Sequence, residues 1–283
     1  MKHIVDADWL YNNYKNDNIT IIDCRFDLED KEYGLKQYNT SHIPGAYFID
    51  FEKELTGKIK KHGGRHPLPD VDKLINKLIM IGISKYNPVI VYDDGNLAGA
   101  SRLWFTLRYL GIDNVFVLKD GFRSWLECGY EISTRPTTEF KIGNFDLKVK
   151  KSTVYDKSKM MESIDKDDAI IIDSRSPERY MGEVEPIDIL AGHIPGAVNH
   201  FWQSNFIVEN DDFFLKSIEE IEESFQYIPK KKKIIIHCGS GVTACVNYLL
   251  LTELDYEPKL YVGSWSDWIS YDDTPKVLGV ESK

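Results

Sequence analysis

A chain of 283 residues is about twice the usual size of one domain, so we expect two globular units. Hydrophobic residues make up 42% of the chain and charged residues 28%, a composition that excludes a disordered protein. The 35 Lys and Arg residues against 45 Asp and Glu residues give a net charge of −10, which disfavours nucleic acid and anionic membrane as main partners.

No apolar run approaches the roughly 18 residues that a membrane span requires, and the beginning of the chain lacks the apolar segment of a signal peptide. We therefore expect a cytoplasmic protein. The four cysteines, Cys24, Cys128, Cys238 and Cys245, are too scattered for a disulfide framework, and no two of them form a C-x-x-C pair. The sequence thus predicts neither a metal site nor a dithiol redox centre, and we expect no cofactor.

Short runs of β-branched residues alternate along the chain with helix-like segments. In the first half, residues 19–22, 89–91 and 115–118 predict strands, and residues 74–81 and 102–110 predict helices. Strands that alternate with helices indicate an α/β fold, in which a parallel sheet is covered by helices on both faces.

The two halves of the chain repeat each other. Residues 41–46, Ser-His-Ile-Pro-Gly-Ala, return as Gly-His-Ile-Pro-Gly-Ala at 192–197, and residues 21–25 return at 171–175. Two further matches, an apolar run and a tryptophan-containing segment, keep the same order and nearly the same spacing. The repeat predicts a duplicated domain, with residues 1–133 as one domain, residues 134–148 as a linker and residues 149–283 as the second domain.

The most informative segment is residues 234–244, which predicts a strand, a glycine-containing loop and the start of a helix. Cys238 is the first residue after the strand, and parallel sheets bind ligands beyond the carboxyl ends of their strands. Gly239 and Gly241 allow the loop to turn successive N–H groups inward, toward an anion. These groups and the helix start would stabilise a thiolate and lower the pKa of Cys238; a buried core cysteine is the alternative interpretation.

The other cysteines lie in different contexts. Cys245 follows Cys238 by two helical turns and is expected in the core, while Cys24 and Cys128 have no glycine loop beside them. In the first copy, Asp93 stands at the position that corresponds to Cys238. Because an aspartate is not a sulfur nucleophile, we expect the first domain to be catalytically inactive.

Several polar residues recur in both copies. They are Asp23 and Arg25, matched by Asp173 and Arg175, and the histidines His42 and His193. Residues that are retained in a copy without the nucleophile favour a structural role over a catalytic one.

With these residues in place, the chain resembles the two-domain rhodanese-type sulfurtransferases over nearly its whole length. The loop at 238–244, Cys-Gly-Ser-Gly-Val-Thr-Ala, is similar to that of the 3-mercaptopyruvate sulfurtransferase branch. Supporting marks are the two His-Ile-Pro-Gly-Ala segments, the run Gly-Arg-His-Pro-Leu-Pro at 64–69, Trp104 and the run Gly-Ser-Trp-Ser-Asp-Trp at 263–268. The resemblance implies two tandem rhodanese-like domains, of which the second is active, and a persulfide on Cys238 as covalent intermediate.

The resemblance also implies roles for further residues. The implied catalytic residues are Cys238, Ser240, His66 and Glu52, the last two from the inactive domain. Arg179 would hold the carboxylate or sulfonate of the sulfur donor, since a guanidinium group suits such anions. The loop residues that would bind the charged sulfur are Gly239, Gly241, Val242 and Thr243.

The sulfur donor stays open. Mercaptopyruvate enzymes usually carry a second arginine after a Glu-Pro pair that precedes the second His-Ile-Pro-Gly segment, and Ile187 follows that pair here. With neutral Gly239 and Ser240 after the cysteine, we expect Arg179 alone to hold the donor, which favours 3-mercaptopyruvate over thiosulfate, the alternative donor. Expected acceptors are cyanide or a thiol, with thioredoxin or another thiol protein as a candidate partner.

Two other functions fit the sequence less well. A cysteine phosphatase needs an arginine six positions after its cysteine to clamp phosphate, and Ala244 stands there. A non-enzymatic binding module is natural for a loop without a nucleophile, as in the first copy, and Cys238 argues against it for the second.

Overall fold

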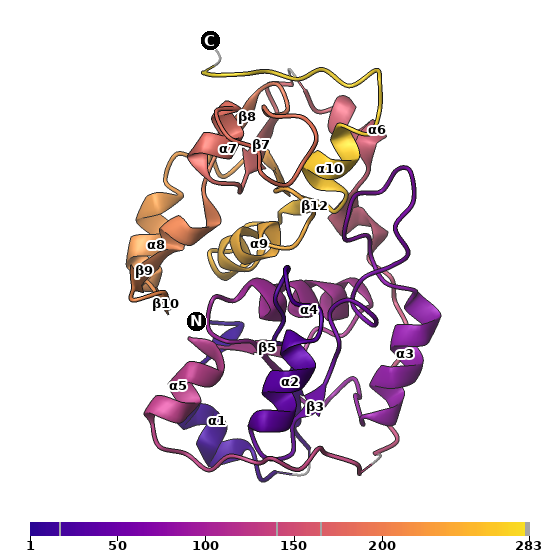
Figure 1. The fold of residues 1–283 in the computed structure, drawn as a ribbon, viewed down its shortest axis with the longest axis vertical. Coiled ribbons are helices and arrows are strands. Elements are labelled where there is room, and N and C mark those ends of the chain that lie inside the picture. Colours follow the sequence, from indigo (N-terminus) through magenta and orange to yellow (C-terminus); the bar gives the residue numbers. More distant parts are fainter. Residues whose placement is uncertain (17, 140, 165, 281–283) are drawn as a thin grey trace. The chain divides into compact units, whose positions relative to one another are not determined.

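The computed structural model describes residues 1–280 except residues 17, 140 and 165, which together with residues 281–283 lie outside the described part (Figure 1). The chain forms two compact units. The first contains Met1–Gly57, Leu68–Lys150 and Ile207–Leu215, and the second contains Lys58–Pro67, Lys151–Phe206 and Lys216–Lys283. The first half of the sequence therefore contributes a short segment, Lys58–Pro67, to the second unit, and the second half contributes Ile207–Leu215 to the first unit.

The first unit is built on a five-stranded sheet in the order β1-β5-β4-β2-β3, in which all neighbouring strands are parallel. Its elements are β1 (Ile4–Val5), α1 (Ala7–Asn13), β2 (Thr20–Asp23), α2 (Tyr33–Thr40), β3 (Tyr47–Phe48), α3 (Val71–Met80), β4 (Val89–Tyr92), α4 (Ala98–Tyr109), β5 (Val115–Leu118) and α5 (Gly121–Glu127). Asp6 and Asp70 begin α1 and α3 by accepting hydrogen bonds from the N–H groups of Trp9 and Lys73.

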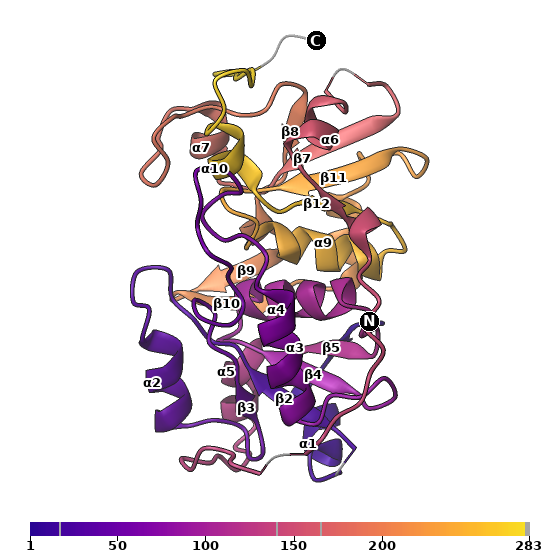
Figure 2. The ribbon, with the colours of Figure 1, turned by 90° about the vertical axis from the view of Figure 1, so that its right-hand side faces the viewer.

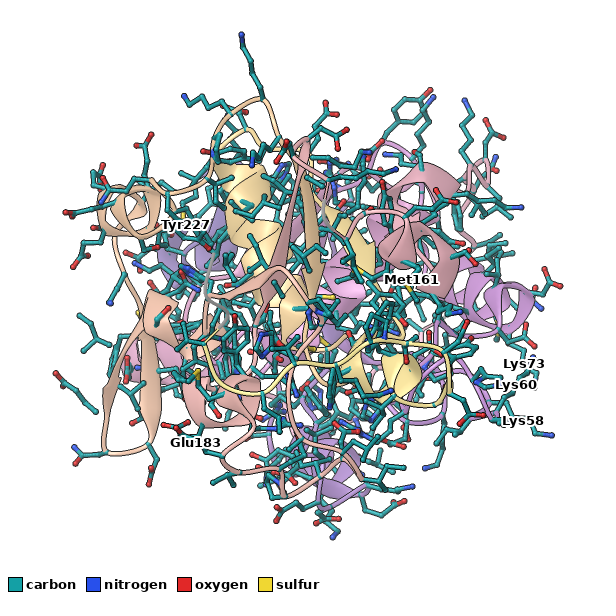
Figure 3. All side chains as sticks on the ribbon, turned by 90° about the horizontal axis from the view of Figure 1, so that it is seen from above. Lys58, Lys60, Lys73, Met161, Glu183 and Tyr227 are labelled. Carbon is teal, nitrogen blue, oxygen red and sulfur yellow. The ribbon has the colours of Figure 1, made fainter. Side chains whose placement is uncertain are left out.

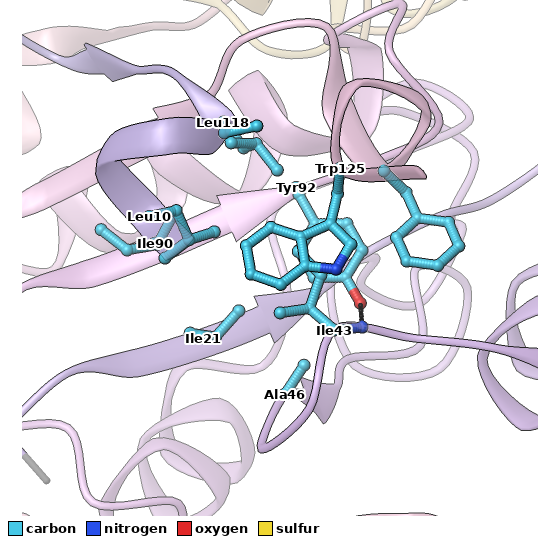
Figure 4. Packing of buried hydrophobic residues seen from close by; sticks show 10 residues of the cluster. Leu10, Ile21, Ile43, Ala46, Ile90, Tyr92, Leu118 and Trp125 are labelled. Carbon is cyan, nitrogen blue, oxygen red and sulfur yellow. Dashed lines mark hydrogen bonds between the residues drawn. The ribbon is translucent and has the colours of Figure 1, made fainter. Parts of the chain in front are cut away.

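Aliphatic and aromatic side chains together form the core on one face of this sheet (Figure 4). Trp125 of α5 packs with Leu10 of α1 and with Ile90 and Tyr92 of the central strand β4. The Tyr92 hydroxyl also accepts a hydrogen bond from the N–H group of Ile43 at 3.2 Å. Helix α4 covers the opposite face (Figure 2), so the sheet is buried on both sides, as the apolar strands predict.

The second unit repeats this architecture in a parallel sheet of order β6-β12-β11-β7-β8. Its elements in chain order are η1 (Lys151–Thr153), β6 (Val154–Tyr155), α6 (Lys157–Met161), β7 (Ala169–Asp173), α7 (Pro177–Met181), β8 (Ala197–Asn199), η2 (Trp202–Asn205), α8 (Ile218–Ser224), β11 (Lys233–His237), α9 (Ala244–Glu253), β12 (Lys259–Tyr261) and α10 (Ser264–Trp268). Between η2 and α8, strands β9 (Phe206–Glu209) and β10 (Asp212–Leu215) form a separate two-stranded sheet, and residues 207–215 belong to the first unit. Because β11 takes the central place that β4 has in the first sheet, the predicted duplication and the α/β class are confirmed.

A buried aspartate–arginine pair occurs at the same place in both units. In the first unit Arg25 binds Asp23 at 2.6 Å and donates to the carbonyl of Ser41, directly before the His-Ile-Pro-Gly-Ala segment. In the second unit Arg175 binds Asp173 at 2.6 Å and donates to the carbonyl of residue 192, at the equivalent place. Each pair therefore joins the end of a strand to the next loop, which is the structural role that its recurrence predicts.

The stretch from residue 134 to residue 148 has neither helix nor strand among its described residues. It is hydrogen-bonded to the first unit, where the N–H group of Gly143 donates to the carbonyl of Ile79 at 2.7 Å and that of Lys148 to Leu110 at 3.1 Å. The stretch predicted as a linker thus runs along the first unit.

All helices are short. The longest, α4, has 12 residues. Over the residues that the structure describes, no helix combines the length and the apolar character needed to cross a bilayer.

The second of the two buried pairs predicts how acid destabilises the protein. Burial alone would raise the pKa of Asp173, but the adjacent Arg175 outweighs it and holds the pKa at about 2, below the ordinary value of 3.8. Because the folded-state value is the lower one, the ionised carboxylate stabilises the fold above about pH 4, and this contribution is lost as the pH falls toward 2. Asp173→Asn should therefore lower the free energy of unfolding at pH 7, and its deficit should shrink by about 1 kcal/mol between pH 5 and pH 3.

Urea titrations of both proteins at several pH values measure this difference. A deficit that stays constant from pH 5 to pH 3 would contradict the assignment of the low pKa to Asp173.

Candidate active site

The loop after β11 is shaped by hydrogen bonds to the start of α10. Cys238 follows the central strand directly, and its N–H group donates to the hydroxyl of Ser264 at 3.1 Å. The carbonyl of Cys238 accepts from the N–H group of Trp265 at 3.0 Å. At Gly241 the loop turns with a φ of +78°, and a Cβ atom there would lie 2.2 Å from the carbonyl oxygen of Val262. Only glycine fits this turn, so the loop conformation depends on that residue.

The turn directs hydrogen-bond donors at the sulfur of Cys238, a residue that is only 1% exposed. The N–H group of Gly241 donates to Sγ at 3.1 Å. Burial alone would raise the pKa of the thiol, but hydrogen bonds from the Thr243 hydroxyl and from the N–H groups of residues 244, 240 and 241 outweigh it and hold the pKa below its usual value. A thiol with these donors is prepared to react as a thiolate.

The segment Lys58–Pro67 brings a histidine to this loop. The segment is fixed within the second unit, where the N–H group of Gly63 donates to the carboxylate of Asp267 at 2.6 Å. Its His66 lies with Nδ1 2.7 Å from the hydroxyl oxygen of Ser240, two residues after the cysteine. The structure thus joins the two predicted residues Ser240 and His66 in one hydrogen bond.

A cluster of guanidinium and carboxylate groups borders the other side of the loop. Arg179, in α7, donates to Glu185 at 2.7 Å and to Asp188 at 3.1 Å. Arg65 contacts the second oxygen of Asp188. A Cβ atom on Gly239 would lie 3.1 Å from Nη2 of Arg65 and 3.4 Å from Nη2 of Arg179. Two arginines therefore lie beside the residue that follows the cysteine.

The expectation that Arg179 is the one cation beside this loop is thus wrong, because Arg65 also lies beside Gly239. Arg65 was not among the predicted site residues, although it stands directly before His66 in the Gly-Arg-His-Pro-Leu-Pro run. Its position next to His66 indicates a place at the site only once the segment is known to belong to the second unit.

Glu52 is assigned to a different unit from the other predicted site residues. It belongs to the first unit, where its carboxylate lies 3.7 Å from the ammonium group of Lys31.

The remaining cysteines do not share the surroundings of Cys238. Cys245 is buried in α9, and its thiol donates to the carbonyl of Gly241 at 3.4 Å. Cys24 is also buried, and burial raises its pKa well above the ordinary value. Cys128 is exposed. Of the four thiols, Cys238 alone lies in a glycine loop at the end of a central strand.

In the first unit the corresponding loop surrounds a carboxylate. Asp93 is 2% exposed and accepts hydrogen bonds from the N–H groups of Gly95 at 2.9 Å, Leu97 at 3.2 Å and Ala100 at 3.1 Å. The carboxylate thus takes the hydrogen-bond donors that the thiol takes in the second unit.

The Thr243 hydroxyl is the donor that most lowers the pKa of Cys238, which allows a direct test. Thr243→Val removes that hydroxyl at nearly constant volume and should raise the thiol pKa, by about one unit for the loss of one hydrogen bond to a charged group. The pH dependence of iodoacetamide alkylation, followed on the Cys238 peptide by mass spectrometry, measures this shift.

Thr243→Ser keeps the hydroxyl and serves as the control, so its profile should match that of the unchanged protein. An identical profile in Thr243→Val would remove Thr243 from the set of groups that ionise the thiol.

Comparison with known proteins agrees with this fold. The chain matches the rhodanese-like domain family twice, over residues 6–128 and 156–271. It is 36% identical over 282 residues to a Pseudomonas aeruginosa protein named "Probable 3-mercaptopyruvate sulfurtransferase", covering 98% of each chain. It is 30% identical over 280 residues to the thiosulfate sulfurtransferase of Cricetulus griseus, covering 94% of this chain and 91% of that protein.

Among solved structures, the 3-mercaptopyruvate sulfurtransferase from Leishmania major superimposes with a TM-score of 0.82 and 30% identity, over 93% of this chain and 73% of that one. Two matched domains, near full-length relatives and a shared fold lead to one conclusion. The chain belongs to the rhodanese family and is a two-domain sulfurtransferase.

Proposed function

We propose that this protein transfers a sulfane sulfur from 3-mercaptopyruvate to a thiophilic acceptor through a persulfide on Cys238. The observation that carries the proposal is the lowered pKa of a thiol that is almost fully buried. Burial opposes ionisation of a thiol, so the hydrogen-bond donors around this sulfur must favour the thiolate by more than burial disfavours it. They are suited to hold a negative charge on the thiolate and on the persulfide that it forms.

In the first half-reaction the Cys238 thiolate attacks the sulfur of 3-mercaptopyruvate. A sulfur–sulfur bond forms, the carbon–sulfur bond of the donor breaks, and its electron pair leaves as the enolate of pyruvate. The proton of the transferred SH group balances the protonation of that enolate, which gives pyruvate and an anionic persulfide. In the second half-reaction cyanide or a thiolate attacks the outer sulfur and the Cys238 thiolate leaves, so the enzyme returns to its starting state.

The pair of Ser240 and His66 is suited to the first half-reaction. Its hydrogen bond of 2.7 Å lets the imidazole polarise or orient the hydroxyl. The hydroxyl can then donate to the carbonyl oxygen of the donor, where charge develops as sulfur leaves. Thiosulfate has no carbonyl group and gains nothing from this contact.

Arg179 is the residue proposed to bind the carboxylate of the donor, because it lies beside Gly239 at the reactive loop. The second cation, Arg65, is a specific reason to keep thiosulfate as a candidate donor. Thiosulfate is a dianion, and two guanidinium groups at the loop offer it more attraction than one. Both donors give the same persulfide, with sulfite as the leaving group from thiosulfate.

The sulfur acceptor in this proposal is a nucleophile that attacks the outer sulfur of the persulfide. Cyanide and small thiols are nucleophilic enough to take the outer sulfur, and a thiol protein such as thioredoxin is a candidate partner for the same step.

Replacing the proposed nucleophile gives the main test. Cys238→Ser should abolish thiocyanate formation from either donor, because a hydroxyl group does not form a persulfide. Incubation of the unchanged protein with donor should add about 32 Da, one sulfur atom, to the Cys238 peptide.

Cys245→Ala is the matched control, since that thiol lies in the same unit outside the donor set. It should lose stability by about 1 kcal/mol or more and keep its specific activity. Substantial thiocyanate production by Cys238→Ser would overturn the proposal.

The role of Ser240 is tested by comparing donors. Ser240→Ala should lower kcat by about ten- to a hundredfold with 3-mercaptopyruvate and much less with thiosulfate, because only the former develops charge on a carbonyl oxygen. His66→Gln should show the same dependence on the donor, since it acts through Ser240. Equal losses with both donors in steady-state kinetics would favour thiosulfate as the natural donor.

A further inference from the structure

One carboxylate joins the two arginines beside the reactive loop. Asp188 binds Arg65 through one oxygen and Arg179 through the other, and its side chain is only 4% exposed. Nη2 of each arginine lies within 3.4 Å of the position that a Cβ atom of Gly239 would take. Asp188 therefore pairs with both cations that lie beside the residue following Cys238.

The neighbouring carboxylate, Glu185, has a different set of hydrogen-bond partners. It accepts hydrogen bonds from Arg175 at 3.3 Å and from Arg179 at 2.7 Å, and also from the N–H groups of Ile187 at 3.1 Å and Asp188 at 3.0 Å. Glu185 thus shares Arg179 with Asp188 and also fixes the backbone of its own loop. The carboxylate of Asp188 differs in that it binds both guanidinium groups that lie beside Gly239.

The geometry points to Asp188 as a specificity-determining residue that limits the positive charge beside Cys238 and so favours a singly charged sulfur donor over a doubly charged one. The inference rests on the proposed sulfurtransferase reaction. Asp188 is a positioning residue in this scheme, because it acts through Arg65 and Arg179 rather than by touching the donor.

Coulomb's law makes the inference quantitative. The interaction of a fixed charge with a donor scales with the donor's own charge, so removal of one negative charge helps a dianion twice as much as a monoanion in free energy. In kcat/KM, the gain for thiosulfate is then the square of the gain for 3-mercaptopyruvate. A change in the ionisation of Cys238 acts equally on both donors and cancels in the ratio of their kcat/KM values.

The central experiment is the donor ratio of Asp188→Asn at about pH 6.5, where thiosulfate is a dianion and 3-mercaptopyruvate a monoanion. We expect kcat/KM to rise about tenfold for thiosulfate and about threefold for 3-mercaptopyruvate, mainly through KM. Arg65→Gln should shift the ratio in the opposite direction. The double variant of Asp188→Asn with Arg65→Gln restores the net charge and should return the ratio toward that of the unchanged protein.

Two controls separate charge from structure. Glu183→Gln removes the same charge from the same loop at an exposed side chain (Figure 3), and it should leave the donor ratio within twofold of the unchanged protein. Asp188→Glu keeps the charge and should keep the ratio. If Glu183→Gln shifts the ratio as far as Asp188→Asn does, or if Asp188→Asn changes both donors equally, the inference is wrong.

A binding measurement tests the same inference without turnover. It compares how strongly sulfate, a dianion, and acetate, a monoanion, slow the alkylation of Cys238 by iodoacetamide. Asp188→Asn should strengthen protection by sulfate more than protection by acetate, and unchanged protection by both would overturn the inference. Failure of the proposed function has a different signature, since neither donor would then add sulfur to Cys238 in the unchanged protein.

Discussion

Both units are organised around a buried acceptor at the carboxyl end of the central strand. The loop after that strand turns several N–H groups inward, and buried donors of this kind are costly unless they are hydrogen-bonded. Asp93 satisfies them in the first unit and the sulfur of Cys238 does so in the second. The exchange of thiol for carboxylate therefore retains the hydrogen bonds and the fold while removing the thiol. This is a physical reason why one copy of a duplicated domain can keep its structure without the thiol of the other.

The charges around the two acceptors differ more than their backbones do. In the first unit, burial and the neighbouring Asp93 raise the pKa of Asp94 to about 7, so this loop gathers acidic groups. In the second unit, Arg65 and Arg179 border the loop and carboxylates offset their charge. A net charge of −10 for the whole chain thus coexists with a local site suited to anions. Local charge, and not the total, decides which ligands the reactive loop attracts.

Much of the fold follows from local sequence patterns, because buried parallel strands must be apolar along their whole length. The strand at Val115–Leu118 was predicted with its observed bounds, whereas α3 begins at Val71, three residues before the predicted start, since Asp70 caps it. The position of Cys238 was equally readable from the strand, loop and helix around it. The assignment of Arg65 to the second unit was not, because it depends on hydrogen bonds between residues about two hundred positions apart, such as that from Gly63 to Asp267. Local periodicity contains no signal for such contacts.

The burial of Cys238 bears on how a large acceptor could take part in the proposed reaction. Cys238 is only 1% exposed, so a small donor would reach its sulfur more easily than a protein thiol would. Once the persulfide forms, the outer sulfur lies about 2 Å beyond the original one, at the length of a sulfur–sulfur bond. An acceptor then has to reach only this outer atom, and the inner sulfur remains among the N–H groups that stabilise it as a leaving thiolate. In the proposed reaction, burial and the persulfide together would therefore allow a protected thiol to serve acceptors much larger than its donor.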